Sequence, residues 1–189
     1  MWQRAASGSG PFRAHSVQGP LGSAWDFPKY CGAMFTGEIV AIYIASDEGK
    51  PTESVAEVRA LEGRGLEGDR YARQEGKFSQ KDDPGREVTL IEFEAIAALK
   101  KDYDIDLGLG GSRRNIVTRG VPLNHLVGLE FQVGEVTLRG IKLCEPCGYL
   151  EGLTQKGIRK GLAHRGGLNA EIVSGGLIRS GDEISGGTG

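Results

Sequence analysis

The chain has few of the residues that build disulfide frameworks and metal centres. Its 189 residues include three cysteines and three histidines. A small, odd number of cysteines predicts no disulfide framework and favours a reducing compartment, which here means the cytoplasm. No apolar run approaches the roughly 20 residues that span a bilayer, and the N-terminal stretch lacks the continuous apolar core of a secretory signal. We therefore expect no membrane partner.

Charge of either sign is not in excess either. There are 23 Lys and Arg against 25 Asp and Glu, for a formal net charge of −2. The chain as a whole therefore has no positive field to attract nucleic acid. This balance predicts that nucleic acid is not a partner.

Glycine, by contrast, is abundant, with 31 residues spread over turn-like positions. This distribution is typical of many short strands joined by tight turns. Residues 1–35 are rich in Gly, Ser and Pro and show no periodicity, so we expect a disordered or extraneous N-terminal extension. Residues 36–186 carry the regular patterns and are expected to form one folded domain.

Those patterns predict a mainly β fold. Residues 37–46 form a β-branched apolar run, residues 56–60 alternate apolar with charged, and residues 63–85 read as a long polar loop. Residues 86–103 read as a strand leading into a helix with an apolar stripe at Ile96, Leu99 and Tyr103. Further strands are expected at 115–118, on both sides of Gly134, and three times between 169 and 184, with a helical turn at 122–128. Seven or eight short strands with one main helix predict a closed or nearly closed β-barrel and disfavour a βαβ fold.

Two of the cysteines, Cys144 and Cys147, lie together in the segment "LCEPCGYLEG". A structural zinc site needs four ligands, and the other soft donors are scattered: Cys31, His15, His125 and His164. A thioredoxin-like couple needs its Cys-x-x-Cys at the start of a helix in a βαβ setting, and the glycine-rich sequence after Cys147 predicts no strong helix. Two inert, partly buried thiols are the third alternative, and composition alone favours it.

The sequence around the pair favours a functional thiol instead. The segment "KGIRKGLAHRGG" behind it contains His164 and Arg165 among further cations, and "GSRRN" ahead of it contains Arg113 and Arg114. If the barrel gathers these segments, cations would surround one thiol and favour the thiolate, the form that attacks or ligates. The arginines could equally hold a phosphate or another oxyanion, or each cation could be a solvated surface charge.

Two further groups have alternative interpretations. Asp69 and Arg70, in "GLEGDRYA", could reach a ligand as part of a lid or form a local ion pair that holds the long loop. His164 could act as a base, a ligand or a cation near the thiolate, or it could be a hydrogen-bonding residue in a turn. His125 is expected to be structural.

Taken in order, the segments "GLEGDRYA", "SRRNIVTRGVPLNHLVGLEFQVGEVTLRG", "LCEPCGYLE" and "LAHRGGLNAEIVSGGLIRSGDEI" resemble the MOSC domain. This family is named for the C-terminal part of molybdenum cofactor sulfurase, and the likeness runs over residues 35–184. It implies a barrel related to the pyruvate-kinase barrel domain, in a small stand-alone member. It also implies one functional cysteine, the second of a Cys-x-Arg-Cys-like segment, which is Cys147 here.

The resemblance gives roles to the neighbouring residues as well. In the family that cysteine is thought to carry sulfur as a persulfide or to ligate molybdenum in a pterin cofactor. The Arg-x-Asn-Ile type motif lands on Arg113, Arg114 and Asn115, a region that lines the pterin pocket in cofactor-binding relatives. The histidine–arginine turn lands on His164 and Arg165, and Asp69 joins the expected cofactor-binding set.

This sequence departs from the family pattern in two ways. Pro146 precedes Cys147 where multidomain relatives commonly have Arg, so one cation is missing. Residues 1–35 also cannot supply the N-terminal barrel that helps hold the pterin in amidoxime-reducing relatives, which leaves open whether this chain alone holds molybdenum cofactor. No desulfurase domain with a pyridoxal-phosphate lysine is expected, so sulfur would have to come from another protein.

Three functions follow as hypotheses. The first is a sulfur carrier or transferase, with a cysteine desulfurase or other donor as one partner and a molybdoenzyme or cofactor acceptor as the other. The second is a molybdenum-cofactor oxidoreductase that reduces N-hydroxylated substrates. The third is a non-catalytic binding module in which the thiols are incidental.

Overall fold

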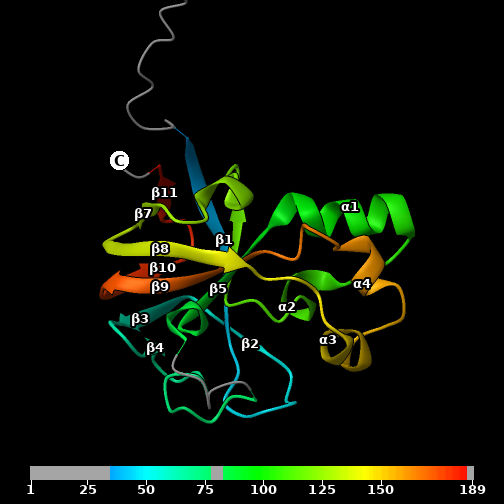
Figure 1. Cartoon of the computed structure of the whole chain (residues 1–189), viewed down its shortest axis with the longest axis horizontal. Helices are drawn as coiled ribbons and strands as arrows, with labels where there is room; N and C mark the ends of the chain where they lie inside the picture. The colour runs from blue at the N-terminus through cyan, green and yellow to red at the C-terminus, as the bar shows by residue number, and fades with distance from the viewer. Residues whose placement is uncertain (1–34, 78–82, 187–189) are drawn as a thin grey trace, which may run out of the picture. The chain divides into compact units, whose positions relative to one another are not determined.

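The computed structural model describes residues 35–77 and 83–186 (Figure 1). The predicted N-terminal extension, residues 1–35, lies outside the described residues except for Phe35. No helix in the described ranges is long and apolar enough to cross a membrane.

Eleven strands carry the fold. They are β1 (Thr36–Ile44), β2 (Glu53–Val55), β3 (Glu57–Leu61), β4 (Gly65–Leu66), β5 (Val88–Glu92), β6 (Ile116–Arg119), β7 (Glu130–Val133), β8 (Val136–Leu143), β9 (Leu168–Ser174), β10 (Gly176–Arg179) and β11 (Glu183–Ser185). Seven of them run side by side in the order β11-β7-β8-β9-β5-β6-β1. The barrel closes because β1 also pairs with β11, Gly37 lying opposite Ile184. Only β5 and β6 among these neighbours are parallel, so the barrel is mixed. The predicted closed, mainly β barrel is confirmed.

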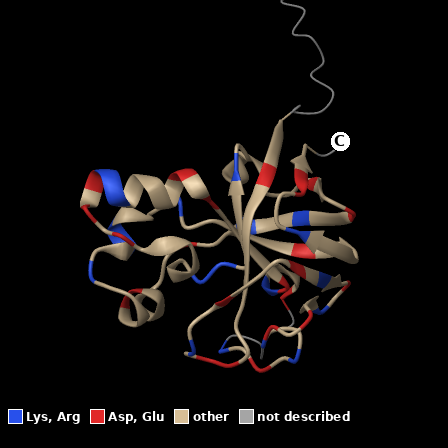
Figure 2. Cartoon of the chain, turned by 180° about the vertical axis from the view of Figure 1, so that it is seen from behind, with Lys and Arg blue, Asp and Glu red and all other residues tan. Residues whose placement is uncertain are grey.

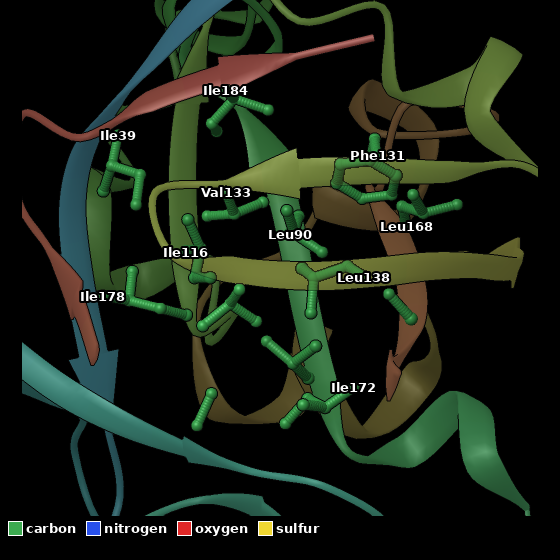
Figure 3. Close-up of a cluster of buried hydrophobic side chains, with 14 of the residues drawn as sticks. Ile39, Leu90, Ile116, Phe131, Val133, Leu138, Leu168, Ile172, Ile178 and Ile184 are labelled. Atoms are coloured by element: carbon green, nitrogen blue, oxygen red, sulfur yellow. The ribbon is translucent and has the colours of Figure 1, made fainter. Parts of the chain in front are cut away.

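Alternating side chains fill the barrel. In β7, for example, Phe131 and Val133 are buried while Glu130 and Gln132 are exposed, as expected when successive side chains point to opposite faces. Figure 3 shows Phe131 in one cluster with residues of other strands, Leu90, Leu138 and Leu168 among them. Burial of this cluster is the main stabilising term for the barrel.

A separate three-stranded sheet has the order β10-β3-β4. The alternating run at residues 56–60 is confirmed as a strand, β3, with Val58 and Ala60 buried. It is separated from β2 by Ala56 alone, and the two strands belong to different sheets.

Helices gather on one side of the barrel (Figure 1). They are α1 (Phe93–Tyr103), α2 (Gly108–Gly111), α3 (Gly148–Leu153) and α4 (Ile158–Gly161), and there are two 3₁₀ turns, η1 (Pro84–Arg86) and η2 (Leu123–Leu126). A second apolar cluster lies between them and the barrel, with Ile91, Leu99 and Leu162 fully buried.

The apolar stripe predicted for α1 holds at two positions and fails at the third. Ile96 and Leu99 are buried, but Tyr103 is 43% exposed. The helix ends at Tyr103, and Asp104 follows in the left-handed conformation. The last turn therefore extends beyond the apolar cluster that the earlier residues contact.

The segment after Cys147 also differs from expectation, because it forms the short helix α3. Its two glycines, Gly148 and Gly152, lie near its ends, and Leu150 is buried in the second apolar cluster. Burial of Leu150 outweighs the low helix propensity of glycine, which is only about 1 kcal/mol per residue.

Candidate functional site

A pocket of about 290 Å³ opens beside the cysteine pair. Strands β5, β8 and β9 each contribute one residue to it, and the turn before β6 and the start of α3 complete its wall together with residues of the loops. Its lining residues are Arg70, Tyr71, Arg86, Thr89, Arg113, Arg114, Asn115, Lys142, Cys144, Glu145, Cys147, Tyr149, Leu150 and Asn169. The structure therefore brings together four of the predicted site residues, which are Arg113, Arg114, Asn115 and Cys147.

The two cysteines are not equivalent. Both are free thiols, but Cys147 is exposed while Cys144 is half-buried. Cys144 is held by the main chain next to β9, because its backbone N–H donates to the carbonyl of Gly167 at 2.7 Å. Cys147 is the residue immediately before α3. Of the two, Cys147 is the thiol that a reagent from solution reaches more readily.

Arg114 acts as a structural clamp between two segments far apart in the sequence. Its Nε donates to the carbonyl of Gly166 at 2.8 Å, and its Nη2 donates to the carbonyl of Cys144 at 3.1 Å. The residue is buried, with 9% of its surface exposed. Two geometrically separate donors on one rigid group suit arginine and not lysine. Arg114 therefore fixes the cysteine segment against the turn before β9.

Asn115, which lines the pocket, and Asp69, which does not, belong to a second hydrogen-bond network. The Asn115 side-chain oxygen accepts from the hydroxyl of Thr89 at 2.8 Å, and its Nδ2 donates to the carbonyl of Tyr43. Buried Asp69 accepts from the backbone N–H groups of Ala45 and Tyr71, each at 2.9 Å. Asn115 Nδ2 also lies 3.4 Å from Asp69 Oδ2.

Arg113 differs from Arg114 and Asn115, because one nitrogen of its guanidinium lacks a hydrogen-bond partner in the described part of the chain. Its Nη2 is buried and has no hydrogen-bond partner among the described residues. Burial lowers the pKa of the Arg113 guanidinium below its usual value, and the positive charge of Arg70 lowers that pKa further. Arginine nevertheless stays protonated at neutral pH. The pocket is therefore lined by a partly buried cation, one of whose nitrogens has no partner among the described residues.

The other cations of the pocket have partners of their own. Arg70 lies 3.7 Å from Asp69, and Arg86 lies 3.3 Å from Asp83, which also binds Lys142. The Asp69–Arg70 pair is the loop-holding ion pair that was one of the two alternatives for these residues. Burial raises the pKa of Tyr71, which keeps that phenol neutral at neutral pH.

His164 and Arg165 are exposed and do not line the pocket. The Nδ1 of His164 lies 3.1 Å from Glu145, whose other carboxylate oxygen accepts from the His164 backbone N–H at 3.0 Å. The His164 carbonyl accepts from Asn124 at 2.8 Å. These contacts match the turn interpretation of His164, and His125 is likewise exposed on η2.

Several pocket residues were not singled out from the sequence. Tyr71 and Tyr149 lie inside the motifs "GDRYA" and "CGYLEG", and their proximity to Asp69 and Cys147 was an available signal. Arg86 and Lys142 had no such signal, because they reach the pocket from η1 and from the end of β8.

No group of three or more His, Cys, Asp or Glu residues that could hold a metal ion occurs in residues 35–77 and 83–186. The zinc alternative therefore gains no support from this part of the chain. Cys31 and His15 lie outside the described residues.

Comparison with known proteins agrees with this architecture. The YuaD protein from Bacillus subtilis has a TM-score of 0.66 at 16% identity, covering 84% of this chain and 99% of its own. YiiM from Geobacillus stearothermophilus has a TM-score of 0.58 at 15% identity, covering 79% of this chain and 74% of its own. YiiM from Escherichia coli has a TM-score of 0.59 at 17% identity, covering 81% and 69%. At these identities the likeness shows a shared fold.

Sequence comparison is more specific. No curated protein sequence matches the chain. The family model described as the MOSC domain matches residues 75–185, which is more than half of the 189 residues and includes Cys147 and most of the pocket lining. The chain therefore belongs to the MOSC domain family.

Proposed function

We propose that the protein is a sulfur carrier in which Cys147 holds sulfane sulfur as a persulfide. A cysteine desulfurase or a similar protein would deliver the sulfur, and a molybdoenzyme or its cofactor would receive it. The observation that carries the proposal is the place of Cys147, an exposed free thiol at a pocket lined by five cationic side chains and one carboxylate, Glu145. A thiolate is the attacking form of cysteine, and it needs an exposed position to meet a sulfur donor.

The proposed step conserves atoms and electrons. The Cys147 thiolate attacks the outer sulfur of the donor persulfide and forms a new S–S bond at Sγ. The S–S bond of the donor breaks, and its electron pair leaves with the donor thiolate. No external oxidant or reductant is consumed. Cys147 can be approached by another protein because it is exposed, whereas Cys144 is half-buried.

Mass spectrometry of the intact protein tests this proposal. After incubation with a cysteine desulfurase and cysteine, we expect a mass increase of one sulfur atom that maps to the peptide with Cys147. Cys147→Ser should abolish the increase and Cys144→Ser should preserve it. Failure of the wild type to gain sulfur from a desulfurase that is active on another acceptor would exclude the carrier role.

The second candidate is an oxidoreductase that binds molybdenum cofactor and reduces N-hydroxylated substrates. The unpartnered Nη2 of Arg113 favours it, because a guanidinium suits a cofactor phosphate and a thiolate suits a soft metal. The pocket residues thus fit the group: Arg113 would hold the phosphate, Cys147 would supply a metal ligand, and Arg114, Asn115 and Asp69 would hold these two in place. When bound, the cofactor would supply the two-electron redox chemistry.

In this second reading, His164 and Arg165 would contact only a ligand or partner that extends beyond the pocket. Metal analysis separates the two candidates. Protein made in a cofactor-competent host should contain close to one molybdenum per chain if the second is correct, and the metal should be lost in Cys147→Ser. A molybdenum content far below one per chain would leave the carrier function as the better account.

A further inference from the structure

We infer that the pocket binds a small sulfur oxyanion, thiosulfate in its simplest form, and that this anion donates sulfur directly to Cys147. The inference deepens the proposed carrier function and rests on it. Its basis is the juxtaposition of the unpartnered guanidinium of Arg113 with the exposed thiol of Cys147 in the lining of one pocket.

Arg113 is the residue that calls for an anion. A buried donor on a charged group is costly when it has no partner, and such groups are normally paired. The pocket-lining cations around it are engaged, Arg70 by Asp69 and Arg114 by two backbone carbonyls. At Arg113, by contrast, Nη2 pairs with neither a carboxylate nor a backbone carbonyl of the described residues. An anion bound in the pocket would pair with this guanidinium, which lines it.

The backbone keeps Arg113 in an unusual conformation. Its φ is +57°, in the left-handed region that few residues other than glycine adopt. The Arg113 N–H donates to the carbonyl of Gly110 at 3.0 Å, and the following residues Arg114 and Asn115 are both anchored. Such conformations persist where the surrounding structure imposes them, and they concentrate at ligand sites.

The chemistry of the pair matches a thiosulfate ion. Its sulfonate end offers three oxygens to a guanidinium, which binds such groups through two parallel hydrogen bonds. Its outer sulfur is the electrophilic partner that a thiolate can attack. A pocket of about 290 Å³ holds an anion of this size together with water. Transfer from thiosulfate requires a cation that binds the sulfonate and a nucleophile that attacks the outer sulfur. Arg113 and Cys147 are suited to these two functions.

The transfer step is balanced. The Cys147 thiolate attacks the outer sulfur of thiosulfate, and a new S–S bond forms at Sγ. The S–S bond within thiosulfate breaks, and its electron pair leaves with sulfite. Cyanide can then take the outer sulfur as thiocyanate and return Cys147 to the thiolate. The product sulfite carries the same anionic group and should compete for Arg113.

The experiment compares two sulfur donors on the same variants. One arm uses thiosulfate, followed by mass spectrometry of Cys147 and by thiocyanate formation with cyanide. The other arm uses a cysteine desulfurase. The variants are Cys147→Ser, Cys144→Ser, Arg113→Gln, Arg113→Lys and Arg59→Gln. The last is a matched loss of charge at an exposed arginine of β3 outside the pocket. Circular dichroism and the thermal midpoint verify folding.

We expect wild type and Arg59→Gln to form the persulfide from thiosulfate, and Cys147→Ser to form none. Loss of a charge-assisted contact should lower kcat/KM for thiosulfate by about tenfold or more in Arg113→Gln, with partial recovery in Arg113→Lys. The desulfurase arm should change less than about threefold, because its donor is a protein. Sulfite should slow alkylation of Cys147 in wild type and not in Arg113→Gln.

The outcomes separate the two proposals. If the desulfurase loads Cys147 but thiosulfate does not, the inference is overturned and the carrier function stands. If neither donor loads it, both are overturned. If thiosulfate loads Arg113→Gln as fast as wild type, or if Cys144→Ser is the variant that loses the reaction, the pairing of Arg113 with Cys147 is wrong.

Discussion

Arg114 donates from Nη2 to the backbone carbonyl of Cys144, 30 residues away in the sequence, at 3.1 Å. The same guanidinium donates from Nε to Gly166, which is 52 residues away. The arginine beside it in the sequence, Arg113, lines the pocket, and its buried Nη2 has no hydrogen-bond partner among the described residues. Two adjacent arginines therefore differ, because Arg114 holds the cysteine segment whereas Arg113 keeps a donor without a partner among the described residues.

Arg114→Lys tests the holding role. One ammonium group cannot reproduce both directed hydrogen bonds, so a buried carbonyl loses its partner. We expect the free energy of unfolding to fall by about 2 kcal/mol in urea denaturation. Hydrogen exchange of the amides in residues 143–148 should also become faster. Arg59→Lys is the exposed control, and equal exchange rates in Arg114→Lys and wild type would contradict the clamp.

Gly166→Ala tests how tightly the same segment packs. A Cβ at Gly166 would overlap the carbonyl oxygen of Cys144 and come within 2.8 Å of Pro146 Cδ. We expect a destabilisation of about 2–3 kcal/mol, which is typical of overpacking, together with a changed alkylation rate at Cys147.

Gly152→Ala is the matched control for that substitution. Gly152 lies in α3 and has nothing within 4 Å of the added Cβ. Alanine there should raise the stability by about 0.5–1 kcal/mol, because it is the better helix former. Equal effects of the two substitutions in urea denaturation would refute the packing described for Gly166.

Asp69→Ala tests the hydrogen-bond network around the Asp69 carboxylate. The substitution leaves the backbone N–H groups of Ala45 and Tyr71 without their acceptor. Unsatisfied buried donors cost about 1–3 kcal/mol each, so we expect a loss of about 2–4 kcal/mol in unfolding free energy. Asp102→Ala, at an exposed position of α1, should change stability by less than about 0.5 kcal/mol. A loss no larger than that of Asp102→Ala would show that Asp69 does not hold the loop.

Glu92 predicts a dependence of stability on pH. Burial raises the pKa of its carboxyl above the usual 4.5, and the carboxylate accepts from the backbone N–H of Leu123 at 2.9 Å. A raised folded-state pKa means that the favourable contribution is complete below about pH 4.5 and is lost as the pH rises through the folded-state value.

As the pH rises from 4 to 7, the unfolding free energy of Glu92→Gln should therefore increase relative to that of wild type. Urea denaturation at the two pH values measures this difference. Glu67→Gln, at an exposed position, reports the effect of removing one surface charge. A difference between Glu92→Gln and wild type that is the same at both pH values would disprove the burial effect.

Local patterns in the sequence were sufficient for the architecture. The β-branched run at residues 37–46 and the alternation at 56–60 became β1 and β3, because side chains of a strand alternate between its two faces. The strand and helix at residues 86–103 became β5 and α1. The order of motifs along the chain identified the family.

Local patterns were not sufficient where long-range burial decides the structure. The sequence after Cys147 formed α3 because Leu150 is buried against other elements, and burial of a leucine side chain outweighs the low propensity of two glycines. The stripe on α1 ended before Tyr103, which is 43% exposed and does not belong to the buried cluster that Ile96 and Leu99 join.

The sequence by itself determined the barrel class and the family, and it singled out four residues that line the pocket: Arg113, Arg114, Asn115 and Cys147. Only the tertiary structure distinguished Arg113 from Arg114 and left His164 outside the pocket. The physical reason is that strand periodicity is a local property, whereas the partner of a buried donor is set by which distant carbonyl the closed barrel places beside it. Gly166 and Cys144 satisfy Arg114 in this way, and no described residue satisfies Nη2 of Arg113.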